Sequence, residues 1–332
     1  MGVYHFMGLG RSPGAVTVAL SYLAARYQRW NTSDQQFFAA SGEVGQTTRP
    51  GNVQALVLFT TPEVRRGKVD CVPYLDNQPG SARGTGVGQP GPMLEVLWKV
   101  MRDDLRALAG GRPSVAVYWC DYDRIRPTQT FERVARTLLA VKPPGRLGKE
   151  VWVNLTGGTN VLNSAFELAA SLTSVPARMY YVLSEETRCV RHTLPLAVIG
   201  SEDDTQWVEL PIVHAALSEQ HLTTLLEIPS KPPGMRISEL YSRLKGHGEP
   251  FAHITSPEQL KLQYLVQLRS QHLIELDEAT GQVHIGPRWP VLARYYEAIP
   301  EPVGTGAAES LTLDELANSE DWFHRAADLS LE

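Results

Sequence analysis

The 332-residue sequence has only three cysteines, Cys71, Cys120 and Cys189, and they lie far apart. An odd number of widely spaced cysteines gives neither a disulfide framework nor a zinc-binding pair. The sequence has no run of eighteen apolar residues, and its first residues lack the basic segment and long apolar core of a signal peptide. We therefore expect a protein of a reducing, cytoplasmic compartment, with no membrane contact, no metal and no cofactor.

Charge is divided unevenly along the chain, although the formal net charge is only −5. Residues 1–200 hold 22 Lys and Arg against 15 Asp and Glu, whereas residues 201–332 hold 9 against 21. The basic first part suits an anionic ligand, and the acidic second part would repel nucleic acid as a whole. The chain length and the ordinary composition indicate a globular protein of two domains.

The first 200 residues alternate between short apolar runs and segments with helical spacing. The runs are uninterrupted, which is typical of strands buried on both faces of a parallel sheet. This pattern predicts an α/β fold, a Rossmann-like domain over residues 1–200 with a mainly parallel sheet. The polar residues 31–52 are expected to be irregular, and the Gly/Pro-rich residues 77–92 to form a loop or insertion. The predicted strands are Val3–Met7, Val53–Phe59, Ser114–Trp119, Val151–Leu155 and Met179–Leu183, and the predicted helices are Ala15–Tyr27, Met93–Leu108, Thr128–Val141 and Val161–Thr173.

The pattern changes after residue 200. Helices are predicted over Ser218–Ile228, Ile237–Leu244 and Pro257–Ser270, followed by a hairpin that turns at residues 278–281 and by one more helix after Pro287. Three helices and a two-stranded hairpin occur in this order in a winged helix-turn-helix domain, which we predict for residues 205–300. Residues 301–332 are predicted to be an acidic C-terminal tail.

A glycine-containing loop joins the first predicted strand to the first helix. It contains Gly8, Gly10 and Gly14, with Arg11 and Ser12 between them. Glycines allow close backbone approach, the N-terminus of a helix attracts negative charge, and the two side chains add hydrogen-bond donors. The spacing is close to that of the dinucleotide fingerprint, but the acidic residue of that fingerprint is missing, because the second strand ends in Thr60-Thr61, which argues against NAD. The alternative is a tight turn that serves only packing.

A second loop of this kind follows the strand that ends near residue 155. It is rich in hydroxyl and amide groups and again leads into a helix, but no Gly-Lys-Ser/Thr follows, so it is not a Walker loop. Two such loops in one sheet predict one continuous anion site; the alternative is an Asn/Thr helix cap with a turn. The residues concerned are Asn154, Thr156, Gly157, Gly158, Thr159 and Asn160.

The stretch VWVNLTGGTNVLNSAFELAASL and the following ARMYYVLSE resemble the strand–TGGT–helix–strand element of the CRISPR-associated Rossmann fold (CARF) family. The segment GLGRSPGAVT resembles the first ligand loop of that family, in which a winged helix commonly follows the sheet. The resemblance covers roughly residues 1–300. It implies a homodimer that binds a cyclic oligoadenylate, the cyclic tetra- or hexa-adenylate of type III CRISPR antiviral defence, across its two-fold axis.

Carried over by motif, Gly8, Gly10, Arg11 and Ser12 would hold one side of the ligand, and the residues of the second loop would hold the other. Family members that cleave the ring, the ring nucleases, need no metal and often have Lys at the place of Asn160. Cleavage requires orientation of a ribose 2′-hydroxyl and charge stabilisation. The candidate catalytic residues are therefore Ser12, Arg11 and Asn160, with Arg124 or Arg126 as substitutes for the missing charge. The resemblance leaves open whether the ring is cleaved or only sequestered.

A second hypothesis is a ligand-controlled transcriptional regulator that binds DNA through the predicted winged helix. The third helix offers Gln259, Lys261, Gln263 and Arg269, which are side chains able to contact bases in a major groove. Residues 218–298 hold 8 basic and 9 acidic residues, which is a poor balance for neutralising phosphates. The other role for this domain is dimerisation. A third hypothesis, an ordinary nucleotide-dependent enzyme, is disfavoured by the missing acidic residue.

Overall fold

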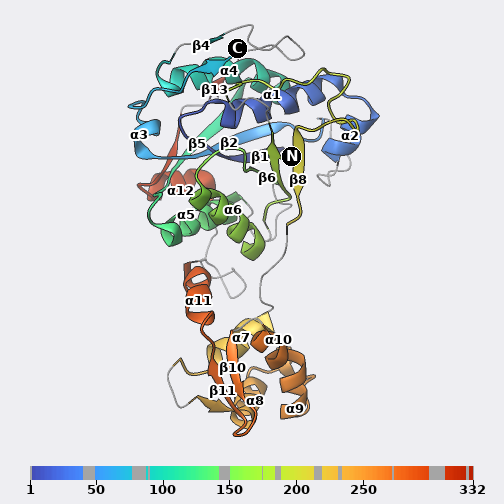
Figure 1. Cartoon of the computed structure of the whole chain (residues 1–332), viewed down its shortest axis with the longest axis vertical. Helices are drawn as coiled ribbons and strands as arrows, with labels where there is room; N and C mark the ends of the chain where they lie inside the picture. The colour runs from blue at the N-terminus through green and yellow to red at the C-terminus, as the bar shows by residue number, and fades with distance from the viewer. Residues whose placement is uncertain are drawn as a thin grey trace. The chain divides into compact units, whose positions relative to one another are not determined.

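The computed structural model divides the chain into two compact units (Figure 1). Unit 1 comprises Met1–His214 and Glu301–Glu332, and unit 2 comprises Ala215–Pro300, so unit 2 is an insertion in unit 1. The described residues are 2–39, 49–76, 87–88, 90–141, 150–173, 175–183, 188–212, 219–230, 234–270, 273–298, 311–326 and 329–331. Most of the predicted Gly/Pro-rich loop at 77–92 lies outside them.

A mainly parallel sheet forms the centre of unit 1, with the strand order β12-β5-β2-β1-β6-β7-β8 and with β13 also paired to β5. The five strands from β5 to β7 in this order are parallel to one another, whereas β8, β12 and β13 pair antiparallel with their neighbours. The predicted α/β class with a large, mostly parallel sheet is therefore confirmed. The strands are β1 (Val3–Gly8), β2 (Val53–Thr60), β5 (Ser114–Asp121), β6 (Glu150–Asn154), β7 (Arg178–Val182), β8 (Trp207–Leu210), β12 (Phe323–Arg325) and β13 (Leu329–Ser330).

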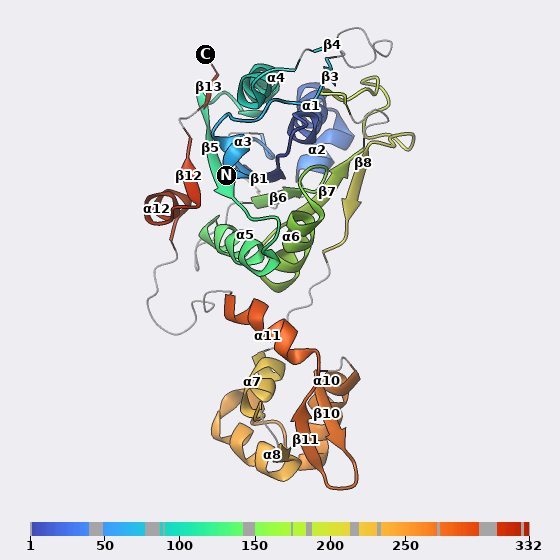
Figure 2. The same cartoon turned by 60° about the vertical axis from the view of Figure 1, so that its left-hand side comes forward.

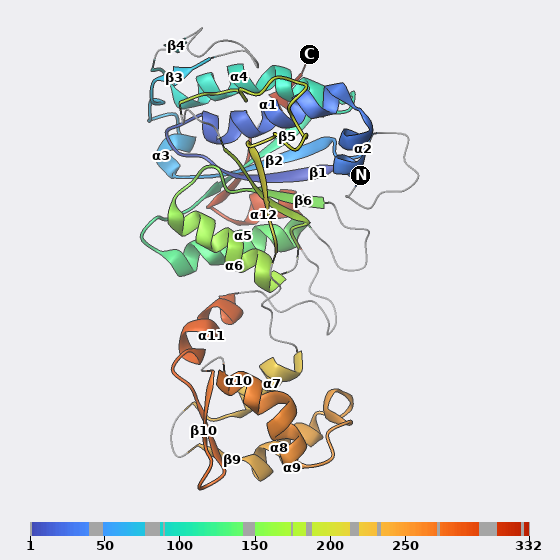
Figure 3. The ribbon, with the colours of Figure 1, turned by 45° about the vertical axis from the view of Figure 1, so that its right-hand side comes forward.

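Helices cover both faces of this sheet, as Figures 2 and 3 show. The helices α1 (Gly14–Arg29) and α4 (Met93–Leu108) pack on one face, and α5 (Pro127–Val141) and α6 (Asn160–Thr173) on the other. The apolar residues of α4 recur every three or four positions and are buried, which places one side of the helix against the core. The short elements α3 (Pro62–Arg65), β3 (Tyr74–Leu75) and β4 (Val87–Gly88) connect β2 to α4.

The order of the strands places a topological switch point between β1 and β6. From β1 the chain proceeds outward to β2 and β5, and it then returns to β6 on the other side of β1. The loops that follow β1 and β6 therefore leave from adjacent strands and lead to helices on opposite faces. Ligands of open α/β sheets bind at the carboxyl ends of the strands at such a point.

The prediction that residues 31–52 are irregular is wrong for their first part, because Thr32–Ala39 forms the helix α2. Its polar sequence hides a buried ion cluster: Asp34 accepts hydrogen bonds from Arg26 at 2.8 Å and from Arg29 at 2.6 Å. Phe38 is fully buried and stacks on Trp152 with ring centroids 6.1 Å apart. The helix is therefore stabilised by tertiary contacts rather than by a pattern visible in the sequence.

The residues after 311 return to unit 1 and pair with β5. The helix α12 (Leu313–Ser319) begins with a capping box in which Thr312 and Glu315 bond each other's backbone amides. The buried side chain of Phe323 in β12 stacks on Tyr118 of β5 with ring centroids 5.6 Å apart. The segment predicted as an acidic tail thus contributes two strands to the central sheet.

Unit 2 contains helices around a small antiparallel sheet with the order β10-β11-β9. The three predicted helices and the predicted hairpin are found, although the third helix is interrupted by a π-helical segment, η2 (Lys261–Leu265). Across the described residues of both units, no helix has the length and apolar character needed to cross a membrane. The elements are α7 (Glu219–Glu227), β9 (Met235–Arg236), α8 (Ile237–Gly246), η1 (Glu249–Phe251), α9 (Pro257–Leu260), η2, α10 (Val266–Ser270), β10 (Ile274–Asp277), β11 (Gln282–Ile285) and α11 (Trp289–Ala298).

Candidate functional site

The loops after β1 and β6 touch each other through their glycines. A methyl group added at Gly8 would lie 2.7 Å from the carbonyl oxygen of Gly157 and 2.8 Å from the amide nitrogen of Gly158. One added at Gly157 would lie 2.4 Å from the carbonyl oxygen of Gly8. These glycines are therefore required because two backbones approach closely, which is the packing role weighed above for the first loop. Gly10 differs, since a methyl group there would meet nothing within 4 Å.

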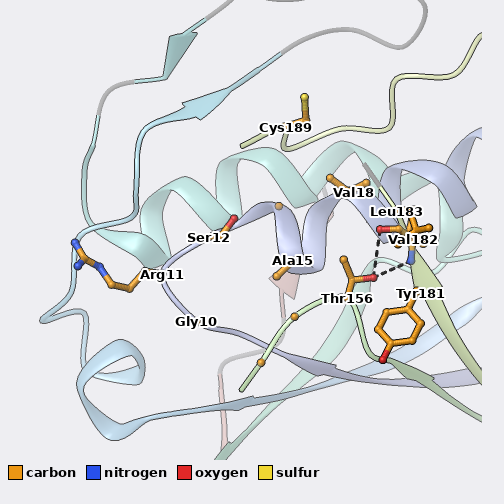
Figure 4. A pocket seen from close by; sticks show the side chains of 13 residues that line it. Gly10, Arg11, Ser12, Ala15, Val18, Thr156, Tyr181, Val182, Leu183 and Cys189 are labelled. Carbon is orange, nitrogen blue, oxygen red and sulfur yellow. Dashed lines mark hydrogen bonds between the residues drawn. The ribbon is translucent and has the colours of Figure 1, made fainter. Parts of the chain in front are cut away.

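The two loops enclose a pocket with a volume of about 540 Å³, which is within the range of small-molecule sites (Figure 4). It lies at the carboxyl ends of β1, β6 and β7, at the switch point of the sheet. Six of the predicted ligand-binding residues line this pocket: Gly10, Arg11, Ser12, Thr156, Gly157 and Gly158. The remaining lining residues are Gly14, Ala15, Val18, Tyr181, Val182, Leu183 and Cys189.

Three predicted ligand-binding side chains brace the second loop, and one of them, Thr156, also lines the pocket. The fully buried Asn154 donates to the carbonyl oxygen of Ala15 at 3.0 Å and accepts from the Thr156 amide at 2.8 Å. The Thr156 hydroxyl accepts from the amide of Val182 at 2.8 Å, and the Thr159 hydroxyl accepts from the amide of Leu162 at 3.3 Å. Their side chains thus hold the loop against α1, β7 and its own helix, as in the helix-cap alternative.

Hydrogen-bond donors in the pocket come instead from the backbone and from Ser12. Within the described part of the chain, the amides of Gly10, Gly157 and Gly158 and the Ser12 hydroxyl donate no hydrogen bond. Two helices, α1 and α6, begin at this point, so their positive ends add to the potential. Unpaired amides at two adjacent helix N-termini form a site for an anion such as a phosphate.

The two candidate catalytic residues beside Ser12 lie at the edge of this site. Arg11 lines the pocket and is exposed; its Nε donates to the carbonyl oxygen of Asp70 at 3.4 Å. Asn160 is the exposed first residue of α6 and does not line the pocket, although it directly follows the loop. The structure therefore brings Ser12 and Arg11 together at the pocket and leaves Asn160 beside it.

Arg124 and Arg126 are not brought to the pocket. Both are exposed on the loop after β5, which is two strands away from β1 in the sheet. Arg126 pairs with Asp123 at 3.4 Å. Hydrogen bonds from its own amide and from Thr61 lower the pKa of the Glu63 carboxyl group, and the Arg124 charge adds to this effect. Neither arginine is among the lining residues, so within this chain they do not replace the charge that Asn160 lacks.

Sequence reasoning missed the side chains at the end of β7. Tyr181, Val182 and Leu183 line the pocket at the point where β7 ends beside the second loop. The strand itself was predicted, and a ligand in a parallel sheet contacts the ends of several strands. An aromatic residue two positions before the end of a predicted strand was the available signal.

The segment around Cys189, which lines one side of the pocket, is attached to β3 by hydrogen bonds and to Asp76 and Asp104 by an ion cluster. Leu75 of β3 donates to the Arg188 carbonyl oxygen at 2.9 Å and accepts from the Val190 amide at 3.0 Å. Arg191 then reaches Asp76 at 3.3 Å and Asp104 of α4 at 3.5 Å. Burial raises the pKa of Asp104 to about 7, although the positive charge of Arg191 opposes this shift.

Replacing Asp104 by Asn is expected to stabilise unit 1, and to do so more at pH 8 than at pH 5. The pKa of Asp104 is higher in the folded protein than its usual 3.8, so the folded state favours the protonated carboxyl group. The stability of the folded protein therefore falls as the pH rises through about 7 and this group ionises. Asn is neutral in both states and has no such loss. A pKa difference of about 3 corresponds to about 4 kcal/mol at pH 8. Urea unfolding at both pH values measures this; equal stability of Asp104→Asn and the parent at pH 8 would contradict it.

No group of three or more His, Cys, Asp or Glu side chains among the described residues is arranged to hold a metal ion. No protein-family model matches the chain. The chain is similar to an uncharacterized protein of Archaeoglobus fulgidus, with 29% identity over 193 residues. The match covers 56% of this chain and 58% of that protein, so each protein extends well beyond the shared part.

Proposed function

We propose that unit 1 is a CARF-like domain that binds a cyclic oligoadenylate in the pocket between the loops after β1 and β6. The protein would act as a homodimer in the cytoplasm, within type III CRISPR defence. Each subunit would contribute the same two loops to a ligand that has a two-fold axis of its own. Cyclic tetra-adenylate and cyclic hexa-adenylate both satisfy this symmetry.

One observation carries this proposal: two strand–glycine loop–helix elements meet at the switch point of the sheet, and the amides of Gly10, Gly157 and Gly158 and the Ser12 hydroxyl have no partner among the described residues. Unpaired donors at helix N-termini favour phosphate groups. The apolar part of the lining, which includes Val18 and Leu183, suits the nucleoside part of the same ligand. The basic balance of residues 1–200 supports an anionic ligand as well.

Ring cleavage is the activity that this site would support. A ribose 2′-hydroxyl attacks the adjacent phosphorus, the bond to the 5′-oxygen breaks, and the products are a 2′,3′-cyclic phosphate and a 5′-hydroxyl that takes up a proton. Ser12 and the free glycine amides would donate to the phosphate oxygens as negative charge develops. Asn160 adds no charge, so we expect cleavage to be slow and binding to be the main effect.

Incubation of the full chain with radiolabelled cyclic tetra-adenylate and cyclic hexa-adenylate tests both parts of the proposal. Retention of label on the protein measures binding, and separation of linear products over hours measures cleavage. Binding without products would overturn the ring-nuclease activity and leave sequestration. Absence of binding for both rings at micromolar protein would overturn the proposed function.

Replacing Gly10 by Val is expected to abolish ring binding while leaving stability unchanged within about 0.5 kcal/mol. A Cβ atom at Gly10 would meet nothing within 4 Å, and Gly10 lines the pocket, so we expect the added volume to be taken from the pocket. Gly246→Val is the matched control, because a side chain at Gly246 in unit 2 also meets nothing within 4 Å. Ring binding by Gly10→Val at the parent affinity would show that the ligand lies elsewhere.

The winged-helix interpretation of unit 2 remains part of this proposal, with dimerisation rather than DNA binding as its role. Lys261 and Arg269, two of the four candidate DNA-contacting residues, both pair with Glu278 in the turn between β10 and β11. The Gln259 side chain accepts from the amide and hydroxyl of Thr255. Gln263 is exposed. A gel shift with the DNA upstream of the protein's own gene tests the hypothesis of a transcriptional regulator. A sequence-specific shift would support DNA binding by unit 2 and contradict a role in dimerisation alone.

A further inference from the structure

Two consecutive tyrosines in β7 have different surroundings. Tyr180 is fully buried, stacks on Trp207 with ring centroids 4.3 Å apart, and has its hydroxyl 3.3 Å from Nδ1 of His5. Tyr181 is partly exposed and lines the pocket, and it makes neither a hydrogen bond nor a ring contact with the described residues. Neighbours in a strand point to opposite faces, so one tyrosine belongs to the core and the other is available to a ligand.

The end of the pocket beside Tyr181 leaves apolar surface uncovered. Leu183 is 51% exposed, and the partly exposed Ala15 lines the same pocket from α1. A ligand group that covers these side chains gains the free energy of removing apolar surface from water. The group must be apolar on its faces, and a flat aromatic ring meets this requirement best beside a tyrosine.

The donors lie at the other side of the pocket. Figure 4 shows Arg11 and Ser12 on one side and Tyr181 and Leu183 on the other, with Thr156 near the latter pair. The bond from the Val182 amide to the Thr156 hydroxyl, 2.8 Å long, fixes the end of β7 to the second loop. This bond holds the end of β7, which contains Tyr181, against the second loop.

We infer that Tyr181 is the stacking platform for one base of the ligand and fixes the direction in which a nucleotide lies in the pocket. The phosphate lies at residues 10–12 and the base at Tyr181 and Leu183. The inference rests on the proposed function in one respect, that the ligand is a nucleotide. It does not require the ligand to be cyclic.

Two fluorescent probes test this inference on the full chain, each with 2-aminopurine in place of one adenine: cyclic tetra-adenylate and a linear diadenylate with a 3′-phosphate. Stacking quenches the fluorescence of this base. The parent and Tyr181→Phe are expected to quench both probes and to bind with similar affinity. Tyr181→Leu is expected to bind roughly 10- to 100-fold more weakly, with loss of the quenching. Thermal unfolding of Tyr181→Leu is expected to match the parent closely, since the Tyr181 side chain makes neither a hydrogen bond nor an aromatic ring contact with the described residues.

Parent-like binding and quenching by Tyr181→Leu would overturn the stacking role and leave the proposed function intact. Quenching of the linear probe alone, lost in Tyr181→Leu, would support stacking and overturn a cyclic ligand. If the parent quenches neither probe, stacking on Tyr181 is overturned whatever the retention of the radiolabelled rings.

Discussion

Replacing Asp34 by Ala is expected to lower the free energy of unfolding of unit 1 by about 3–5 kcal/mol. The Asp34 side chain is fully buried and accepts hydrogen bonds from Arg26 and Arg29. Arg26 is itself buried, with its guanidinium 3.8 Å from the ring centroid of Phe37. Removing the carboxylate leaves the buried Arg26 guanidinium without its anionic partner in a region of low dielectric constant, which costs more than the ion pair contributes.

Denaturant unfolding followed by tryptophan fluorescence measures this loss, because six of the seven tryptophans belong to unit 1. Asp203→Ala is the matched control, since Asp203 is an exposed carboxylate of the same unit. A loss below 1 kcal/mol for Asp34→Ala would contradict the prediction.

The Asp34 contribution has a defined pH dependence. Burial alone would raise the pKa of Asp34, but hydrogen bonds from Arg29 and Arg26 outweigh burial, and the pKa lies below its usual 3.8. The stabilisation is therefore complete above about pH 4 and is lost as the pH falls through the lowered pKa. The two proteins should consequently converge in stability only in strongly acidic solution.

Replacing Gly8 by Ala is expected to destabilise unit 1 by about 1–3 kcal/mol and to weaken ligand binding by roughly 100-fold. The added methyl group would lie 2.7 Å from a carbonyl oxygen and 2.8 Å from an amide nitrogen of the second loop, and backbone atoms cannot rotate away. The two loops must separate, which moves the Gly157 and Gly158 amides away from the first loop.

Gly10→Ala provides a stringent comparison for Gly8→Ala, because it places the same methyl group two residues further along the same loop. Nothing lies within 4 Å of that position, so we expect the parent stability. Denaturant unfolding and label retention on both variants measure the two effects. Equal stability of the two variants would show that the loops can separate at little cost.

Many regular elements of unit 1 could be predicted because the spacing of apolar residues in the sequence matches which of their side chains are buried. The helix Met93–Leu108 was predicted with the observed ends, since its buried residues recur with helical spacing and Pro92 precedes it. The strands β1 and β2 are apolar along nearly their full length because both faces are covered. The third helix of unit 2 was predicted as continuous, but its π-helical interruption was not, since the sequence has no local signal for it.

Elements that depend on distant partners were missed. The helix α2 packs Phe38 against Trp152 of β6, and β8 is a four-residue strand that pairs antiparallel with β7. The strand β12 pairs with β5, which lies far earlier in the chain. Short polar segments stabilised in this way have no periodicity that a local pattern can reveal.

The two loops that line the pocket were identified from the sequence, but the roles of their individual side chains were not. The sequence identified both glycine-containing segments, and the structure places them on adjacent strands. It did not distinguish Asn154 and Thr156, whose side chains brace the loop, from Ser12, whose hydroxyl is unpaired. That distinction depends on which acceptors lie within 3.5 Å, which is a property of the folded chain.

The return of the chain to β5 has a consequence for synthesis on the ribosome. The residues of β5 are complete at Asp121, but the strand that covers its free edge begins at Phe323. At about 5–20 residues per second, roughly 200 residues separate these events by about 10–40 s. During that interval the nascent sheet presents an uncovered β5 edge, which is a template for pairing with other chains. The whole of unit 2 is made in the same interval, so unit 1 is the first to begin folding and the last to finish.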